Sequence, residues 1–431
     1  MTSENTRREL RKSSVAGDAP RPIARHGRLR RSTPWAGAAK IVGTGLAVVL
    51  VSATTIAGAA VWNIANAIKP GVTLIGESEG PPPNIGAYEG GINMLLVGSD
   101  SGEGDAQFGE RDGATLNDVN ILIHVAEDHS SATVVSFPRD MFVSVPACPR
   151  EGGGTHRAVS SAKINTTLTR GGLACVVATV EQFTGMSIEF AAKIEMGGVI
   201  QMSNAVGGVD VCVAKAIRDR QIGLYLDAGT HTLEGNDAQL FLRSRYGVTG
   251  GTDVARINNQ YVFLSSLVRK VKSDEVLGNP LTVYSLALAA ADNMQLSNSL
   301  RNINTLMAIG LTVKDIPLEN IVFAQYPTSF GGGGLIANKT AGNVLINAIK
   351  ADQPVVIAGG TGDGAVINDV QPTPSPTPSS SPSPSGEPSA SPSASPPASE
   401  APPVAAVTLP GQINGQTAAQ STCSTGQTAG G

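Results

Sequence analysis

The longest uninterrupted apolar run of the chain covers residues 41–68, which contain no charged side chain. A helix needs roughly 20 such residues to cross a bilayer, and a signal peptide has a shorter apolar core. Residues 1–40 carry ten basic and three acidic side chains, a bias typical of the cytoplasmic side of a membrane. The pattern predicts a basic cytoplasmic segment over 1–40 and a single transmembrane helix over 41–68. Cleavage near the small residues 57–60 is the alternative.

Two further segments lack the apolar content of a core. Residues 69–90 are rich in glycine and proline, which predicts a stalk. Residues 371–403 consist almost wholly of Pro, Ser, Thr and Ala, a composition that buries too little apolar surface to fold. We therefore expect a disordered Pro/Ser-rich tail over 366–431. If Cys423 near its end is paired, it ties that tail to the body.

The intervening residues 91–365 alternate short apolar runs with amphipathic stretches and predict one extracytoplasmic domain. Helical periodicity predicts helices over 173–183 and 253–271, others within 280–308, and one that opens at 232–238 and runs into Arg243. Strands interspersed with helices predict an α/β sandwich with a mixed sheet. The predicted strands are the short apolar runs at 92–97, 119–125, 132–137, 188–194, 209–213 and 321–326.

Charge and cysteine content narrow the function classes. The net charge is −4 although residues 1–40 are basic, so the remainder is acidic, which argues against a nucleic-acid partner. The glycine run 331–334 lacks the Lys-Ser/Thr of a P-loop and is interpreted as a flexible loop. Four cysteines beyond the span predict two disulfides, with three pairings open. They are Cys148, Cys175, Cys212 and Cys423.

Two carboxylates stand at the ends of neighbouring predicted strands. Asp100 follows the run 92–97, and Asp118 precedes the run 119–125. If these strands pair, both carboxylates lie at one sheet edge, where oxygen ligands with open positions suit Mg²⁺ and a substrate phosphate. The alternative is that Asp100 is a turn residue and Asp118 a strand cap.

A second group of side chains is mainly cationic. Arg139 follows a predicted strand, and Arg243 and Arg245 face one way if the backbone there is extended. Guanidinium forks bind phosphate oxygens, so arginines beside a metal indicate phosphoryl transfer. The alternative is an exposed Asp253–Arg256 ion pair with solvated arginines elsewhere. One face of the helix over 253–271 carries Asp253, Arg256 and Gln260.

Six sequence blocks within residues 91–272 together resemble the LytR-CpsA-Psr family of bacterial envelope proteins, and the cysteines and tail resemble its actinobacterial members. The resemblance implies an α/β/α sandwich that binds a polyprenyl pyrophosphate carrier. It also implies transfer of the attached glycopolymer, as a phosphodiester, to the 6-hydroxyl of muramic acid in peptidoglycan. In order, the blocks are NMLLVGSD (93–100), SFPRD (136–140), KIN (163–165), AVGGVDV (205–211), RSR (243–245) and DVARINNQ (253–260).

The resemblance also implies residue roles. Asp100 and Asp118 would hold Mg²⁺, with Mn²⁺ as a substitute, and Asp253 and Arg256 would complete the pocket. Leu116 stands where the family usually has a phosphate-binding arginine, and Arg111 is a possible replacement. With Arg139, Asp253 and Arg256 as the catalytic set, the substrate-binding side chains would be Arg139, Arg243, Arg245, Arg256 and Gln260.

The lipid part of the carrier requires an apolar channel. Two other functions stay open: hydrolysis of the same lipid pyrophosphate with water as acceptor, or non-catalytic binding at the cell wall. A non-catalytic binding protein would be expected to have lost the charged pocket residues, and this chain has nearly all of them. The channel candidates lie within 173–205 and are Val176, Val177, Val180, Phe183, Val199, Ile200 and Met202.

Overall fold

The computed structural model divides the chain into two compact units, Met1–Trp62 and Asn63–Gly431. No helix among the described residues is long and apolar enough to cross a bilayer. The predicted basic segment 1–40 and nearly all of the predicted span 41–68 lie outside those residues, so both stay predictions. The structure describes residues 43–45, 52, 71–76, 90–99, 115–150, 152–273, 276, 286, 289–301, 303–368 and 405–427.

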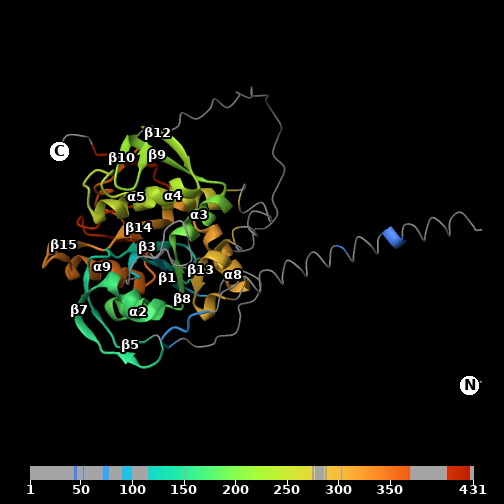
Figure 1. The fold of residues 1–431 in the computed structure, drawn as a ribbon. Coiled ribbons are helices and arrows are strands. Elements are labelled where there is room, and N and C mark those ends of the chain that lie inside the picture. Colours follow the sequence, from blue (N-terminus) through green and yellow to red (C-terminus); the bar gives the residue numbers. More distant parts are fainter. Residues whose placement is uncertain are drawn as a thin grey trace, which may run out of the picture. The chain divides into compact units, whose positions relative to one another are not determined.

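A seven-stranded mixed sheet forms the centre of the second unit (Figure 1). β1 is parallel to β8 and β3 is parallel to β14, whereas the other neighbours are antiparallel. The predicted mixed sheet is thereby confirmed. Its strand order is β13 (Met294–Leu296), β8 (Phe190–Ile194), β1 (Ile92–Ser99), β2 (Asn117–Val125), β3 (Ala132–Ser136), β14 (Ile321–Gln325) and β20 (Gly415–Thr417).

Both faces of this sheet are apolar and both are covered by helices. Along β1, Leu95 and Val97 point into one hydrophobic cluster, and Met94 and Leu96 pack against the other, because side chains alternate along a strand. Helices α2 (Thr167–Thr184) and α9 (Lys339–Lys350) cover the first face. Helices α5 (Asp253–Lys272) and α8 (Ile303–Asp315) cover the second, so the layers are those of an α/β fold (Figure 1).

A second, four-stranded sheet packs on the outer side of α5. Its strand order is β12 (Gly229–Leu233), β9 (Val209–Lys215), β21 (Thr422–Thr425) and β18 (Ala365–Ile367). Ile257 and Tyr261 of α5 face the central sheet, whereas Ala255 and Phe263 join the core under the second sheet. Helix α4 (Gly235–Arg243) packs against both α5 and α3 (Met196–Ala205). The polar side chains of α5 therefore lie between the central sheet and the second sheet, close to α4.

Short elements connect these layers. They are β4 (Phe142–Val145), β5 (Cys148–Pro149), β6 (Thr155–His156), β7 (Val159–Lys163), η1 (Ile164–Thr166), β10 (Ile217–Asp219), β11 (Leu224–Leu226), η2 (Asn298–Leu300), η3 (Leu318–Asn320), β15 (Thr328–Gly331), β16 (Gly334–Ala337), β17 (Val355–Val356) and β19 (Val407–Thr408).

Two predicted segments outside the body are wrong in part. Residues 405–427 of the predicted disordered tail are folded, because β20 completes the central sheet and β21 pairs with β9. Residues 71–76 of the predicted stalk pack against the body, since Leu74 is buried and the Val72 amide donates to the Leu296 carbonyl at 2.9 Å.

The helices predicted within 280–308 are interrupted by β13 and η2. The helix predicted to open at 232–238 begins at Gly235, after β12.

The predicted pair of disulfides is confirmed. Cys148–Cys175 joins β5 to α2 across 27 residues of sequence. Cys212–Cys423 joins β9 to β21 across 211 residues, at a position where the two strands are already in register. The second bridge therefore fastens the C-terminal strand into the middle of the second sheet.

Candidate functional site

Four charged residues from three separate segments meet beside the central sheet, and we call them the charge cluster: Asp118, Arg139, Asp253 and Arg256. Arg139 Nη1 lies 2.7 Å from Asp118 Oδ1, and Arg139 Nε lies 3.1 Å from Asp253 Oδ1. Arg256 Nη2 lies 2.8 Å from the same Asp253 oxygen and also donates to the Asp118 carbonyl at 2.9 Å. Each arginine thus bridges β2 and the start of α5.

Local sequence fixes each member of the charge cluster. Thr252 caps α5 by accepting a hydrogen bond from the Ala255 amide at 3.1 Å, so Asp253 stands in the first turn, where the helix dipole favours an anion. Arg139 lies in a turn after β3, and its carbonyl accepts from the Asn165 amide at 3.1 Å. The cluster is therefore held by backbone as well as by its own ion pairs.

The environment of Asp253 is unusual for a carboxylate. Burial raises its pKa, while the nearby Arg256 and Arg139 guanidinium groups oppose that shift. Its second oxygen, Oδ2, has no hydrogen-bond partner among the described residues. A buried carboxylate with a raised pKa and one unpaired oxygen is suited to accept a proton.

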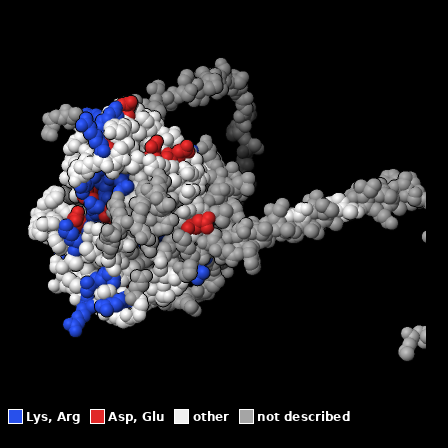
Figure 2. Space-filling view, in the orientation of Figure 1, with Lys and Arg blue, Asp and Glu red and all other residues white. Residues whose placement is uncertain are grey.

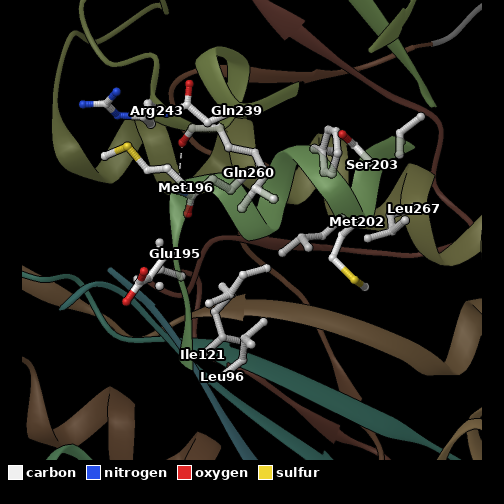
Figure 3. Close-up of a pocket in the computed structure, with 18 of the residues that line it drawn as sticks. Leu96, Ile121, Glu195, Met196, Met202, Ser203, Gln239, Arg243, Gln260 and Leu267 are labelled. Carbon is white, nitrogen blue, oxygen red and sulfur yellow. Dashed lines mark hydrogen bonds between the residues drawn. The ribbon is translucent and has the colours of Figure 1, made fainter. Parts of the chain in front are cut away.

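An apolar cavity of about 260 Å³ opens beside the charge cluster, between the central sheet and helices α3, α4 and α5. Its polar end is formed by Arg243, Arg256 and Gln260 together with Asp118. In Figure 3, Arg243, Gln239 and Gln260 lie toward one end, and Met202 and Leu267 lie toward the other. The apolar lining includes Leu96, Ile121, Val199, Met202, Leu264 and Leu267.

A second space, which we call the polar cleft, adjoins the same cluster through Asp253 and has a volume of about 410 Å³. Its walls carry Asp140, Lys163, Arg245 and the exposed Phe330. In Figure 2 the basic side chains on this face gather along one side, with acidic side chains among them. The charge cluster thus has an apolar space on one side and a polar, open space on another.

The LytR_cpsA_psr family model matches residues 69–353, more than half of the chain. The chain belongs to this family. A similar fold occurs in the crystal structure of protein gbs0355 from Streptococcus agalactiae, with a TM-score of 0.50 and 22% identity over 61% of this chain and 88% of that one.

Relatives of this LytR-CpsA-Psr protein are named for work on the cell wall. The cell wall biosynthesis protein LcpA of Corynebacterium glutamicum is 29% identical over 58% of this chain and 52% of LcpA. Probable cell wall biosynthesis protein LcpB of the same organism is 30% identical over 56% of this chain and 57% of LcpB. The polyisoprenyl-teichoic acid–peptidoglycan teichoic acid transferase TagT of Bacillus subtilis is 26% identical over 54% of this chain and 70% of TagT. The chain spans about half the length of the two Corynebacterium relatives.

Most residues singled out in the sequence come together in this LytR-CpsA-Psr fold. Asp118, Arg139, Asp253 and Arg256 form the charge cluster, and Gln260 lies one turn further along α5, where it donates to the Leu242 carbonyl at 2.9 Å. The Asp253–Arg256 pair is present, but it is buried rather than exposed.

Asp100 and Arg111 lie outside the described residues. The strands flanking the predicted carboxylate pair do pair with each other, since Ser99 is opposite Asn117 in the ladder between β1 and β2. Ser99, the last described residue before Asp100, is therefore opposite the residue that precedes Asp118. Leu116, where the resemblance implied an arginine, directly precedes β2.

The extended backbone on which Arg243 and Arg245 would face one way is not present, and the predicted apolar channel is wrong for its α2 residues. Arg243 and Arg245 do not face one space, because α4 ends at Arg243: Arg243 lines the apolar cavity and Arg245 lines the polar cleft. The channel candidates on α2 belong to the core on the opposite face of the sheet, whereas Val199 and Met202 of α3 line the cavity. The α2 set in that core is Val176, Val177, Val180 and Phe183.

Sequence reasoning missed Asp219, a buried carboxylate that organises the loop after α4. Its Oδ2 accepts hydrogen bonds from the Ser244 hydroxyl at 3.0 Å and from the Arg245 and Gly247 amides at 3.1 and 3.0 Å. Asp219 thereby sets the path of the chain on which Arg245 stands. No motif marks it, because the interaction depends on the β10 strand reaching this loop.

Gln239 is a second residue that the sequence did not reveal. Its side chain lines the apolar cavity at 1% exposure, and neither its amide nitrogen nor its amide oxygen has a hydrogen-bond partner in the described part of the chain. An unpaired buried amide costs about 1–3 kcal/mol. We therefore expect Gln239→Leu to raise the free energy of unfolding by about 1 kcal/mol.

The matched control is Gln416→Leu. Gln416 is equally buried, but its amide nitrogen donates to the Tyr261 carbonyl at 3.1 Å and the Ser265 hydroxyl at 2.9 Å. Its replacement removes both hydrogen bonds and is expected to lower the free energy of unfolding by about 1–3 kcal/mol. Denaturant unfolding measures the change in the free energy of unfolding of each variant. A loss of stability in Gln239→Leu would contradict the prediction for Gln239.

Proposed function

We propose that this protein is an extracytoplasmic transferase, anchored in the cell membrane through residues 41–68, that moves a glycopolymer phosphate from a polyprenyl pyrophosphate carrier to the 6-hydroxyl of a muramic acid in peptidoglycan. The observation that carries the proposal is an apolar cavity opening onto a cluster of arginines and carboxylates. The names of LcpA, LcpB and TagT support the same class of function.

The proposed carrier fits the cavity in two parts. A prenyl chain is apolar and would pack against side chains such as Val199, Met202 and Leu267. The pyrophosphate would lie at the polar end, where Arg243 and Arg256 offer charge-assisted hydrogen bonds. Arg139 and Gln260 complete the proposed set of side chains that bind the carrier, whereas Arg245, also expected there, lines the adjoining polar cleft.

In the proposed reaction the acceptor hydroxyl oxygen bonds to the phosphorus that carries the polymer. The bond from that phosphorus to the bridging oxygen breaks, and polyprenyl phosphate leaves with the electron pair. Asp253 Oδ2 receives the hydroxyl proton. Arg139 and Arg256 stabilise the charge that develops on the phosphoryl and bridging oxygens.

The family implies a divalent cation, and Asp118 fits part of such a site. It presents a carboxylate at the polar end of the cavity, and Mg²⁺ typically uses one or two carboxylates and keeps several waters. No group of three or more metal-binding side chains gathers in the described ranges, from which Asp100 is missing. Asp118 and Asp100 would hold Mg²⁺ or Mn²⁺, whose charge would offset the repulsion between carboxylates and pyrophosphate.

Removal of the metal is expected to abolish transfer. A chelator should stop it, and Mg²⁺ or Mn²⁺ should restore it, since the pyrophosphate would otherwise meet two carboxylates. Asp118→Asn should weaken Mn²⁺ binding to the free protein by roughly tenfold or more, measured by titration without substrate. Unchanged Mn²⁺ affinity in Asp118→Asn would show that this carboxylate is not a ligand.

The test of the function uses the full chain, labelled lipid-linked polymer, Mg²⁺ and peptidoglycan fragments. Label on the fragments supports transfer. Label released as free polymer phosphate would support the hydrolytic alternative, and carrier binding without any release would support the non-catalytic one.

A further inference from the structure

We propose that the polar cleft is the acceptor site, in which Phe330 forms a platform for a sugar ring of the peptidoglycan glycan. The inference rests on the proposed function, because it supplies the second substrate of that reaction. Transfer requires two substrates to approach the charge cluster from different sides. The apolar cavity contacts the cluster through Asp118 and Arg256, and the polar cleft contacts it through Asp253.

A tight β-hairpin builds one wall of the cleft. β15 and β16 pair from Thr328 to Ala337, and the turn at Gly332 and Gly333 has φ of +61° and +81°, values that glycine adopts without strain. A Cβ on Gly334 would lie 2.7 Å from the Asp140 carbonyl oxygen, so only glycine permits this approach. The hairpin that the sequence suggested as a flexible glycine loop is therefore closely docked.

The hairpin is fastened to the segment that carries Arg139. The Leu335 amide donates to the Asp140 carbonyl at 3.0 Å, and Met141 and Leu335 form a parallel bridge. Phe330 is consequently held at a fixed place beside the charge cluster, although its side chain is 78% exposed. The exposed ring therefore gives the cleft one apolar wall beside its charged walls.

The chemistry of the walls matches a glycan better than a lipid. Lys163 Nζ lies 2.9 Å from Asp140 Oδ1, and both groups line the cleft, where sugar hydroxyls can bond to either charge. Arg245 supplies a cation for the carboxylates that peptidoglycan carries. The ring of Phe330 would cover the C–H face of a sugar and bury apolar surface on both partners.

The experiment measures binding of uncrosslinked glycan strands of alternating N-acetylglucosamine and N-acetylmuramic acid to the full chain in detergent, by calorimetric titration without carrier. We expect Phe330→Ala to bind the strands roughly tenfold more weakly, because a buried aromatic ring contributes about that factor. Phe330→Trp, which keeps an aromatic face, should retain the affinity. Tyr225→Ala is the control, since Tyr225 is also exposed, at 59%, and lines neither space.

A parallel titration with polyprenyl pyrophosphate separates acceptor from carrier. Unchanged glycan affinity in Phe330→Ala, or an equal loss of carrier affinity, would overturn the assignment of the cleft. Phe330-dependent glycan binding in a wild-type protein that transfers no polymer would refute the proposed reaction and leave the glycan site standing. Transfer by wild type together with full glycan affinity in Phe330→Ala would refute the acceptor site alone.

Discussion

Replacement of Arg139 by alanine is expected to abolish polymer transfer and to lower the free energy of unfolding by about 3 kcal/mol. Arg139 lies between Asp118 and Asp253, at 2.7 and 3.1 Å, and Asp253 is nearly inaccessible to water. Without the guanidinium, the Asp118 carboxylate loses its ion pair and the buried Asp253 keeps only Arg256. The phosphoryl oxygens would lose a cation at the same time.

Denaturant unfolding and the transfer assay on the full chain test both effects. Arg139→Lys keeps the charge but not the planar fork, so it should recover part of the stability and little of the transfer. Asp227→Ala is the control, because Asp227 forms an exposed ion pair with Arg218, whose loss should cost under about 1 kcal/mol. Transfer at the wild-type rate in Arg139→Ala would contradict the proposed role of this residue.

Loss of the Cys212–Cys423 disulfide is expected to destabilise the protein more than loss of Cys148–Cys175. The bridges span 211 and 27 residues, and the longer loop restricts the unfolded chain more. The chain-entropy relation gives about 5 kcal/mol for the longer loop and about 3.5 kcal/mol for the shorter one.

The measurement compares two double variants, Cys212→Ser with Cys423→Ser and Cys148→Ser with Cys175→Ser, by equilibrium unfolding. Each pair serves as the other's control, since both remove one buried bridge. Equal losses, or a larger loss for the shorter loop, would mean that local packing rather than loop length dominates the contribution.

Five of the seven strands of the central sheet, β1, β2, β3, β8 and β14, were predictable because their pattern is strongly apolar. β14 is buried on both faces and β1 is buried on one face and half-buried on the other, so both have largely apolar sequences. The C-terminal strands were not predictable. β20 has the sequence Gly-Gln-Thr and β21 has Thr-Cys-Ser-Thr; these strands are polar, and the buried side chains of Gln416 and Ser424 bond to α5.

The charged residues of the site were predictable from their places after strands and on one face of a helix. Their partners were not, because the Arg139–Asp253 contact joins segments more than a hundred residues apart. The separation of Arg243 from Arg245 depends on where α4 ends, and helix boundaries are poorly marked in sequence. The importance of Gln239 and Phe330 depends on their neighbours in the folded structure, and no local sequence pattern predicts those neighbours.

β21 pairs with β9 only after the C-terminal residues have been synthesised. This strand lies between β9 and β18, and the β9 residue Val209 lines the apolar cavity. While the last residues are still being made, β9 and β14 each lack a neighbour, and open strand edges invite pairing with other chains. Pairing over such a distance is slow as well. A chain that stops short of residue 415 therefore lacks β20 and β21, and leaves β14 and β9 each with one unpaired edge.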